Sequence, residues 1–332
     1  MKKEEVNKWF NSFNRMNVLV VGDVMIDAYY WGQAKRISPE APVPVAHISS
    51  RENRLGGAAN VALNLKTLGA NPIICSVIGK DEKENVFRAL LNKGDFSDEG
   101  IIASSTRITT VKTRIIADGQ HLLRVDEEDL NPLAKSDEEA LIDRCLEMIS
   151  VQHIHAVVFE DYDKGVLTPR VISEVIKAAQ EKNIPTTVDP KKDHFFDYKG
   201  VDLFKPNLKE LREGLKIEVD PKSKSSLQSA VASLTETLGC VCSMVTLSEH
   251  GVCIQWPEGF EVIPAHPREI ADVSGAGDTV ISVATVLLAA GADPVSMASI
   301  ANLAGGLVCE RVGVVPIKKE RLLSEAEKLC TE

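Results

Sequence analysis

Short, continuous apolar runs alternate along the chain with longer segments of helical periodicity. The apolar runs are five to nine residues long, as is typical of strands buried on both faces of a sheet. These predicted strands cover residues 17–23, 71–79, 155–161, 185–189, 201–207 and 242–248. The predicted helices cover residues 58–69, 82–93, 137–150, 168–182, 222–239, 277–290 and 295–309. The alternation indicates an α/β fold with a mostly parallel central sheet and helices on both faces.

Two segments depart from this alternation. Residues 28–52 and 104–127 alternate polar and apolar positions and have no helical signal. Within the second, the turn at Asp118-Gly119 lies between two strand-like stretches, which predicts a hairpin over residues 110–126. We interpret the two segments as a small antiparallel β flap, or lid, carried by the main sheet. An ordinary edge hairpin without a functional role is the alternative.

Polar residues follow several of the predicted strands. In open, mostly parallel sheets, ligands bind beyond the carboxyl ends of the strands, so these residues are candidates for a functional site. They are Asp23, Glu160, Asp161, Asp189, Asn207 and Ser248.

The stretch ADVSGAGDT, residues 271–279, leads directly into an apolar helical run. Gly275 and Gly277 leave the backbone amides accessible, and amides at a helix start are unpaired and electropositive. The amides of Gly275, Ala276 and Gly277 therefore form a candidate anion site. Asp278 would repel an anion, but it fits as a general base for a hydroxyl held between the carboxylate and the anion. A plain helix N-cap is the alternative.

Glycine and polar residues also begin the predicted helix near residue 58. The spacing around Gly56 and Gly57 is not the dinucleotide-binding fingerprint, but glycines there would let a substrate lie against the backbone. Asn60 offers both a donor and an acceptor to a polyol. Asp23 and Asp27, at the end of the first strand, are acceptors suited to sugar hydroxyls. Each residue also has a structural alternative, as part of a packing helix or a loop.

Composition narrows the class of protein and its partners. The 332 residues are 44% apolar and 26% charged, as in an ordinary globular domain. The formal net charge of -10 disfavours nucleic acid and anionic membranes as partners. The seven cysteines lack metal-ligand spacing and indicate reduced thiols. The chain starts with a short amphipathic helix instead of a signal peptide, and no apolar run reaches spanning length, so we expect a cytoplasmic protein.

Four motifs occur together in this order: GDVMID (22–27), GGAANVALNLKTLGA (56–70), KPNLKE (205–210) and DVSGAGDTV (272–280). With them the chain, from about residue 17 to residue 316, resembles the ribokinase, or PfkB, family of carbohydrate kinases. WGQAKRISPEAPVPV (31–45) is similar to members that phosphorylate D-glycero-D-manno-heptose 7-phosphate in lipopolysaccharide core precursor synthesis.

The resemblance implies one ribokinase-like kinase domain over residues 1–332, with the flap inserted and without the nucleotidyltransferase domain to which many relatives are fused. The expected reaction uses ATP and Mg²⁺ to phosphorylate the anomeric O1 of heptose 7-phosphate, which gives the 1,7-bisphosphate. A monovalent cation is a possible further cofactor. A homodimer through the flap is expected. The alternatives are a kinase of another sugar, sugar phosphate or nucleoside, a silent sugar-phosphate-binding regulator, and a dinucleotide-dependent oxidoreductase.

The family's residue roles transfer onto matching positions of this chain. Asp278 is the expected base, which the helix start would keep ionised, with the amides of Gly275, Ala276 and Gly277 as the anion hole. Expected nucleotide contacts are Lys164, Lys205, Asn207, Glu210, Ser248, Gly251 and Asn302, and Asn207 and Glu210 would hold Mg²⁺ through water. Expected substrate contacts are Asp23, Asp27, Gly56, Gly57, Asn60, Arg114, Arg124 and Asp161. Asp189 and Lys191 would lie near the phosphate path.

Two points remain open within this assignment. The cations available for the 7-phosphate are Lys35, Arg36, Arg107, Lys112, Arg114 and Arg124. Arg114 and Arg124 rank first because they alternate with apolar residues in the predicted hairpin. Glu160 stands where the family resemblance leads us to expect a small residue, and it adds a negative charge beside Asp161.

Overall fold

Nine strands form the central sheet of this computed structural model, which describes residues 1–266, 268–311 and 313–330. In spatial order they are β13 (Gly259–Ile263), β12 (Val252–Trp256), β11 (Cys242–Thr246), β10 (Leu203–Phe204), β9 (Thr186–Asp189), β8 (Ile154–Glu160), β1 (Asn17–Gly22), β4 (Asn71–Gly79) and β5 (Ile101–Ser104). All pairs from β11 to β5 are parallel, and only the β12 and β13 pairings at one edge are antiparallel. The predicted, mostly parallel sheet is confirmed.

Helices cover both faces of the sheet, because successive apolar residues of each strand point to opposite sides. Val18 and Val20 of β1 pack in one core cluster, and Leu19 and Val21 pack in the other. The first cluster includes α1 (Lys3–Ser12), α2 (Ala58–Thr67), α3 (Glu82–Lys93), α8 (Ala276–Ala289), α9 (Pro294–Cys309) and α10 (Lys319–Glu327). The second includes α4 (Lys135–Val151), α5 (Pro169–Glu181), α6 (Leu208–Leu215) and α7 (Lys224–Leu238). Among the described residues, none of these helices combines the length and apolarity needed to cross a membrane.

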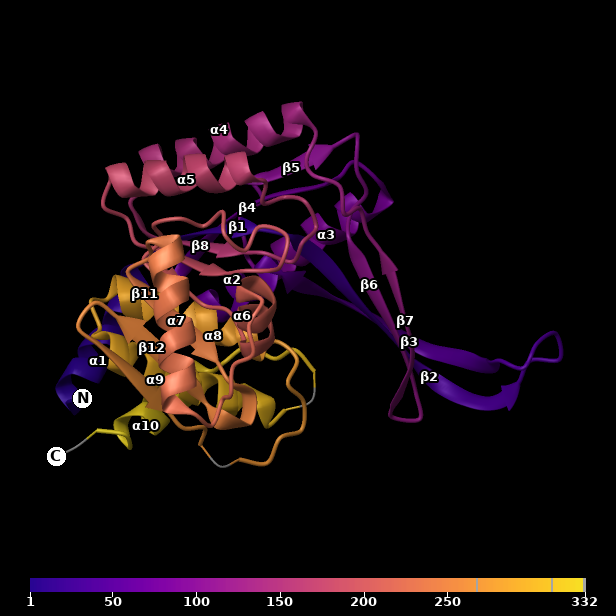
Figure 1. Ribbon diagram of the computed structural model, residues 1–332. Coiled ribbons are helices and arrows are strands. Elements are labelled where there is room, and N and C mark those ends of the chain that lie inside the picture. The colour runs from indigo at the N-terminus through magenta and orange to yellow at the C-terminus, as the bar shows by residue number, and fades with distance from the viewer. Residues whose placement is uncertain (267, 312, 331–332) are drawn as a thin grey trace.

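A second sheet forms the flap that projects from the body of the molecule (Figure 1). It consists of β2 (Val24–Ile37), β3 (Pro44–Gly57), β6 (Val111–Ala117) and β7 (Gln120–Glu127) in the order β3-β2-β6-β7. The two hairpins are antiparallel as expected, but β2 and β6 join them as a parallel pair. The flap is therefore a mixed sheet, in which a central parallel pair joins two antiparallel hairpins.

The flap also begins and ends elsewhere than the sequence pattern suggested. β2 and β3 extend the first segment to residues 24–57, and most of residues 105–110 form a loop before β6. Gly56 and Gly57, expected at the start of a helix, are the last residues of β3, and Gly57 is also the N-cap of α2. Gly57 has a φ of +60°, and a Cβ there would lie 2.2 Å from the main-chain oxygen of Asp23. Glycine therefore permits the abrupt change from flap strand to helix α2.

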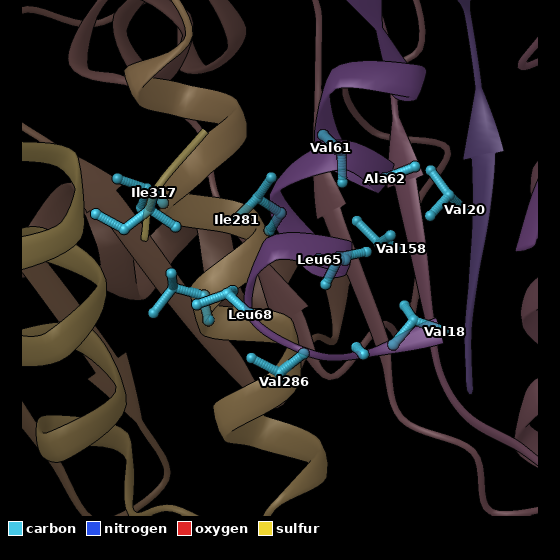
Figure 2. Close-up of a cluster of buried hydrophobic side chains, with 14 of the residues drawn as sticks. Val18, Val20, Val61, Ala62, Leu65, Leu68, Val158, Ile281, Val286 and Ile317 are labelled. Atoms are coloured by element: carbon cyan, nitrogen blue, oxygen red, sulfur yellow. The ribbon is translucent and has the colours of Figure 1, made fainter. Parts of the chain in front are cut away.

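The packing of α2 provides a test of the core. Figure 2 shows Leu65 of α2 among side chains from β1, β8 and α8, and Leu65 is fully buried. We expect Leu65→Ala to lower the free energy of unfolding by about 2–5 kcal/mol, measured by urea denaturation, because it removes apolar contacts and leaves a cavity. Val151→Ala, at a residue 77% exposed, is the control and should change it by less than about 0.5 kcal/mol. Equal effects of the two substitutions would contradict this packing.

Candidate active site

A cleft of about 270 Å³ lies between the flap and the start of α8. Its lining residues are Met25, Asp27, Gly57, Asn60, Lys112, Arg114, Arg124, Tyr162, Ser274, Gly275, Asp278 and Val314. Eight of them are residues predicted from the sequence: Asp27, Gly57, Asn60, Lys112, Arg114, Arg124, Gly275 and Asp278. The fold thus brings the polyol contacts, the flap cations and the predicted base to one cavity.

Asp278 lies in the first turn of α8 and is only 6% exposed. Its carboxylate accepts hydrogen bonds from Asn60 Nδ2 at 2.6 Å and from the Tyr162 hydroxyl at 2.8 Å. Burial raises the pKa of the Asp278 carboxyl, and the two hydrogen bonds, which lower it, offset this only in part. Burial therefore reverses the direction of the pKa shift expected from the helix start. Such a carboxylate is a better proton acceptor than an ordinary aspartate.

The backbone amides beside Asp278 lie at the N-terminus of α8, which is where a helix binds anions. Gly275 is the N-cap of α8 with a φ of +76°, and Ala276 and Gly277 follow as the first helical residues. A Cβ on Gly277 would lie 3.3 Å from Asp189 Oδ2 and 3.9 Å from Lys205 Nζ. The amide group of the helix start therefore adjoins a buried ion pair, in which Lys205 Nζ lies 2.8 Å from Asp189 Oδ2.

A chain of charges leads from this ion pair to the start of α6. Lys191 Nζ lies 3.7 Å from Asp189 Oδ1 and 2.8 Å from Glu210 Oε1. Burial by itself lowers the pKa of Lys191, but Asp189 and Glu210 raise it, so that the net shift is upward and the ammonium group stays charged. Asp189, Lys191 and Lys205 thus form a continuous polar path between the anion site and Glu210.

Residues 15–320 match the family model described as pfkB family carbohydrate kinase. The chain belongs to this family. It is 38% identical over 326 residues to the bifunctional protein HldE of Citrifermentans bemidjiense, and the match covers 98% of this chain and 66% of the relative. The chain thus spans slightly less than two thirds of that relative's length.

Solved structures agree with the family assignment at the level of the fold. Phosphofructokinase-2 from Escherichia coli in complex with potassium superposes with a TM-score of 0.77 at 18% identity, covering 95% of this chain and 98% of that chain. Arabidopsis thaliana ribokinase complexed with ribose and ATP gives a TM-score of 0.69 at 17% identity, covering 93% and 98%. The expected ribokinase-like fold and membership of the carbohydrate kinase family are both confirmed.

In this pfkB-family chain, Asn207 and Glu210 form a reciprocal cap at the start of α6. Asn207 N donates to Glu210 Oε2 at 2.8 Å, and Glu210 N donates to Asn207 Oδ1 at 2.9 Å. Because Lys191 holds the other Glu210 oxygen, the carboxylate is already occupied by direct donors. Oxygen donors suit Mg²⁺, which keeps several waters, so the pair fits a magnesium site contacted through water.

Three predicted substrate contacts, Asp23, Gly56 and Asp161, lie outside the cleft lining, and the two aspartates hold neighbouring groups of the protein. Asp23, 1% exposed, accepts hydrogen bonds from the backbone amides of Tyr162, Lys164 and Val166. Its carboxylate therefore orders the loop after β8.

Asp161 is occupied in a similar way. Its carboxylate accepts hydrogen bonds from the Tyr198 hydroxyl at 2.6 Å and from the Asp163 amide at 2.8 Å. Burial, with a smaller contribution from Asp23, raises the pKa of Asp161 to about 7. Lys164, from the same loop, lies 2.9 Å from Glu128 just beyond β7, so this ion pair connects the loop to the end of the flap.

Tyr162 is a lining residue that the sequence analysis missed. It follows β8 directly, and its hydroxyl donates to Asp278. Burial, with Asp278 and Glu160 close by, raises the pKa of Tyr162 well above its usual range, so the hydroxyl remains a donor. Its position directly after a predicted strand could have marked Tyr162 as a site residue. The prediction selected charged residues at that position and therefore left out the tyrosine.

The predicted nucleotide contacts beyond α6 lie away from the 270 Å³ cleft. Ser248 and Gly251 occupy the turn between β11 and β12, where Gly251 has a φ of +91°. The backbone of Asn207 bridges to Thr246, which places this turn beside the start of α6. Asn302 of α9 donates to the Pro264 carbonyl oxygen at 2.9 Å. The turn after β11 therefore adjoins the start of α6, where the polar path from the anion site ends at Glu210.

The loop held by Asp23 gives a prediction that needs no ligand. We expect Asp23→Asn to raise amide hydrogen exchange at Tyr162, Lys164 and Val166 by roughly ten- to hundredfold, because hydrogen bonds to a charged acceptor contribute about 1.5–3 kcal/mol. Mass spectrometry of exchanged peptides measures this. Asp27→Asn, in the flap, serves as the control and should leave the loop unchanged. Unaltered protection in Asp23→Asn would show that Asp23 does not order the loop.

Proposed function

We propose that this chain transfers the γ-phosphoryl group of ATP to the anomeric hydroxyl of D-glycero-D-manno-heptose 7-phosphate, giving the 1,7-bisphosphate. The observation that supports this most directly is the buried Asp278 carboxylate beside the backbone amides at the start of α8, in a cleft lined by flap cations. Family membership supports the sugar kinase class. The resemblance of residues 31–45 to heptose 7-phosphate kinases supports the substrate.

Asp278 is the proposed general base. The anomeric hydroxyl would take a position next to the Asp278 carboxylate and give its proton to it as the oxygen attacks the γ-phosphorus. The raised pKa of Asp278 makes it a stronger base for this step. Asn60 and Tyr162 hold the carboxylate in one orientation. The amides of α8 stabilise the charge on the transferred group, whose transition state is loose, so that positioning and electrostatics dominate the rate gain.

The phosphate path would hold the nucleotide. Lys205 and Lys191 offer positive charge beside the helix start, and Asn207 and Glu210 would hold Mg²⁺ through water. When bound, Mg²⁺ supplies neutralising charge for the phosphate oxygens. Ser248, Gly251 and Asn302 are the proposed contacts farther along the nucleotide. A monovalent cation is a second proposed cofactor, supported by the potassium complex of the phosphofructokinase-2 neighbour.

The flap would hold the sugar phosphate. Asp27 and Asn60 are the proposed hydroxyl partners, with Gly56 and Gly57 lying against the sugar. Arg114 is ion-paired with Asp27 at 2.5 Å, so it connects the hydroxyl and phosphate ends of the cleft. Among the lysine and arginine side chains that line the cleft, Arg124 is the most exposed, at 60%, and it lies 3.0 Å from Asp126, so it is the proposed partner of the 7-phosphate.

We also propose that two copies of the chain pair through their flaps in the cytoplasm, where ATP is supplied. The β2–β3 hairpin extends away from the body (Figure 1), and near its tip Ile37 and Val43 are 62% and 52% exposed. Apolar side chains at such a tip favour a protein partner over solvent.

A coupled assay of ATP consumption tests the proposed reaction. Purified protein is assayed with heptose 7-phosphate, fructose 6-phosphate and ribose in the presence of Mg²⁺. The proposal predicts the highest kcat/KM with heptose 7-phosphate. A preference for fructose 6-phosphate would overturn the substrate, and no turnover with any sugar would overturn the kinase assignment.

Replacement of the base separates catalysis from binding. Asp278→Asn should lower kcat by about two or more orders of magnitude, because the amide cannot accept the proton. Isothermal titration should show that ATP and sugar phosphate still bind. Asp293→Asn, which removes a carboxylate from the start of the neighbouring helix α9, is the control and should keep most of the activity. Near-normal turnover in Asp278→Asn would rule out the proposed base.

Removal of one flap cation tests the phosphate end of the cleft. Arg124→Gln should raise the KM for heptose 7-phosphate by roughly tenfold or more, because it removes a charge-assisted hydrogen bond. The KM for ATP should stay within about twofold, because ATP binds at the other end of the site. Arg170→Gln on α5, far from the cleft, should alter neither constant. Steady-state kinetics would contradict the assignment if both KM values changed equally.

A further inference from the structure

Glu160 is a buried carboxyl without a partner. It is the last residue of β8 and is 1% exposed. Neither of its carboxylate oxygens accepts a hydrogen bond from any residue within 1–266, 268–311 or 313–330. An ionised carboxylate in this situation is strongly disfavoured, so either a bound proton or a bound cation must account for it.

The surroundings of Glu160 come from several elements that pack against it. Its carboxylate has an oxygen within 4.8 Å of oxygens of Asp189, at the end of β9, and Asp278, at the start of α8. Lys191 and Lys205 are the charged groups of opposite sign around it. On the β1 side the backbone is too close for a side chain, since a Cβ on Gly22 would lie 2.1 Å from the main-chain oxygen of Glu160. The Tyr162 hydroxyl, also nearby, donates to Asp278.

The carboxyl groups of this cluster outnumber its ammonium groups. Glu160, Asp189 and Asp278 lie beside Lys191 and Lys205, and Lys191 also pairs with Glu210, so at least one retained proton lowers the excess negative charge. Asp189 already has Lys205 at 2.8 Å, and Asp278 has two hydrogen-bond donors. Glu160 alone lacks a donor, so the proton belongs there.

We propose that Glu160 is held as a neutral carboxylic acid and acts as a positioning residue, which faces Asp278 and Asp189 without adding a negative charge beside the amides of α8. In agreement, burial above all, and then Asp189 and Asp278, raise the pKa of Glu160 well above its usual range, although Lys191 and Lys205 lower it. Ionised Glu160 would repel an incoming phosphoryl group and weaken the anion site. This last consequence rests on the proposed kinase function, whereas the bound proton does not.

A divalent cation held by the same three carboxylates is the competing explanation. Lys205 and Lys191 argue against it, because they already supply two positive charges to the cluster and one of them occupies an oxygen of Asp189. The two explanations differ in what the native protein holds at this cluster at neutral pH: a proton in one, a divalent cation in the other.

The pH dependence of stability distinguishes them. Unfolded Glu160 ionises near its ordinary value of 4.5, whereas the native protein keeps the proton, so wild-type stability falls as pH rises above that value. Glu160→Gln has no proton to lose. The ratio of the unfolding constants of wild type and Glu160→Gln should therefore grow about tenfold per pH unit above pH ~5, measured by urea denaturation with a metal chelator present.

The matched control is Glu147→Gln on α4, whose side chain is 57% exposed, and its ratio should stay constant with pH. A constant ratio for Glu160→Gln as well would overturn the proposal. Infrared spectra of wild-type protein with ¹³C-labelled glutamate give a second measurement that needs no variant. They should contain a protonated glutamate carboxyl band at neutral pH, and its absence would also overturn the proposal.

Manganese binding and kinetics complete the test. Mn²⁺ alone should not bind to ligand-free protein at a site that Glu160→Gln abolishes. Such binding would show that the cluster is a metal site, and it would overturn the bound proton. In the kinase assay, wild type should lose activity at alkaline pH as Glu160 ionises, and Glu160→Gln should not show this alkaline loss. If the ratio of unfolding constants depends on pH but the protein has no kinase activity, only the proposed function is refuted. If the protein is an active kinase but the ratio stays constant with pH, only this inference is refuted.

Discussion

A carboxylate buried at the start of a helix is stable only if the surrounding chain supplies donors to it, and Asp278 imposes that requirement on this fold. The donors come from two other parts of the chain, Asn60 of α2 and Tyr162 of the loop after β8. Because parallel strands end at one edge of the sheet, these segments and the start of α8 meet there without long connections. The same burial raises the pKa of Asp278 and so makes it suited to accept a proton.

Asp23 fixes the relative positions of the elements that hold this carboxylate. Its side chain accepts three backbone hydrogen bonds from the loop that carries Tyr162, and its main-chain oxygen accepts one from Ala58 at the start of α2. β2 then leaves the body directly after Asp23 as the first flap strand. One buried residue thus connects the end of β1 with both donors of Asp278 and with the flap that carries Arg114. The neutral Glu160 that we propose completes this arrangement, since a second buried charge beside Asp278 would oppose it.

The central fold could be predicted from sequence because strands buried on both faces leave continuous apolar runs, and all six predicted strands occur. The edge strands β12 and β13 were not predicted, since buried residues cover only Val252 to Ile254 of β12 and only Phe260 of β13. The glycine-rich start of α8 and the residues lining the cleft from the flap were also predictable, because motif and alternation mark them. The roles of Asp23 and Tyr162 were not, because they depend on which backbone groups and side chains the tertiary fold brings near. The direction of the Asp278 pKa shift was missed for the same reason: burial is a property of the packed structure.

A crystal structure with heptose 7-phosphate and a non-hydrolysable ATP analogue is the most direct test of the central claim. The account predicts that an oxygen of Asp278 lies within hydrogen-bond distance of the anomeric hydroxyl of the sugar, with the terminal phosphate of the nucleotide against the amides of Gly275, Ala276 and Gly277. A complex in which the sugar hydroxyls bind elsewhere, with Asp278 still held only by Asn60 and Tyr162, would contradict it.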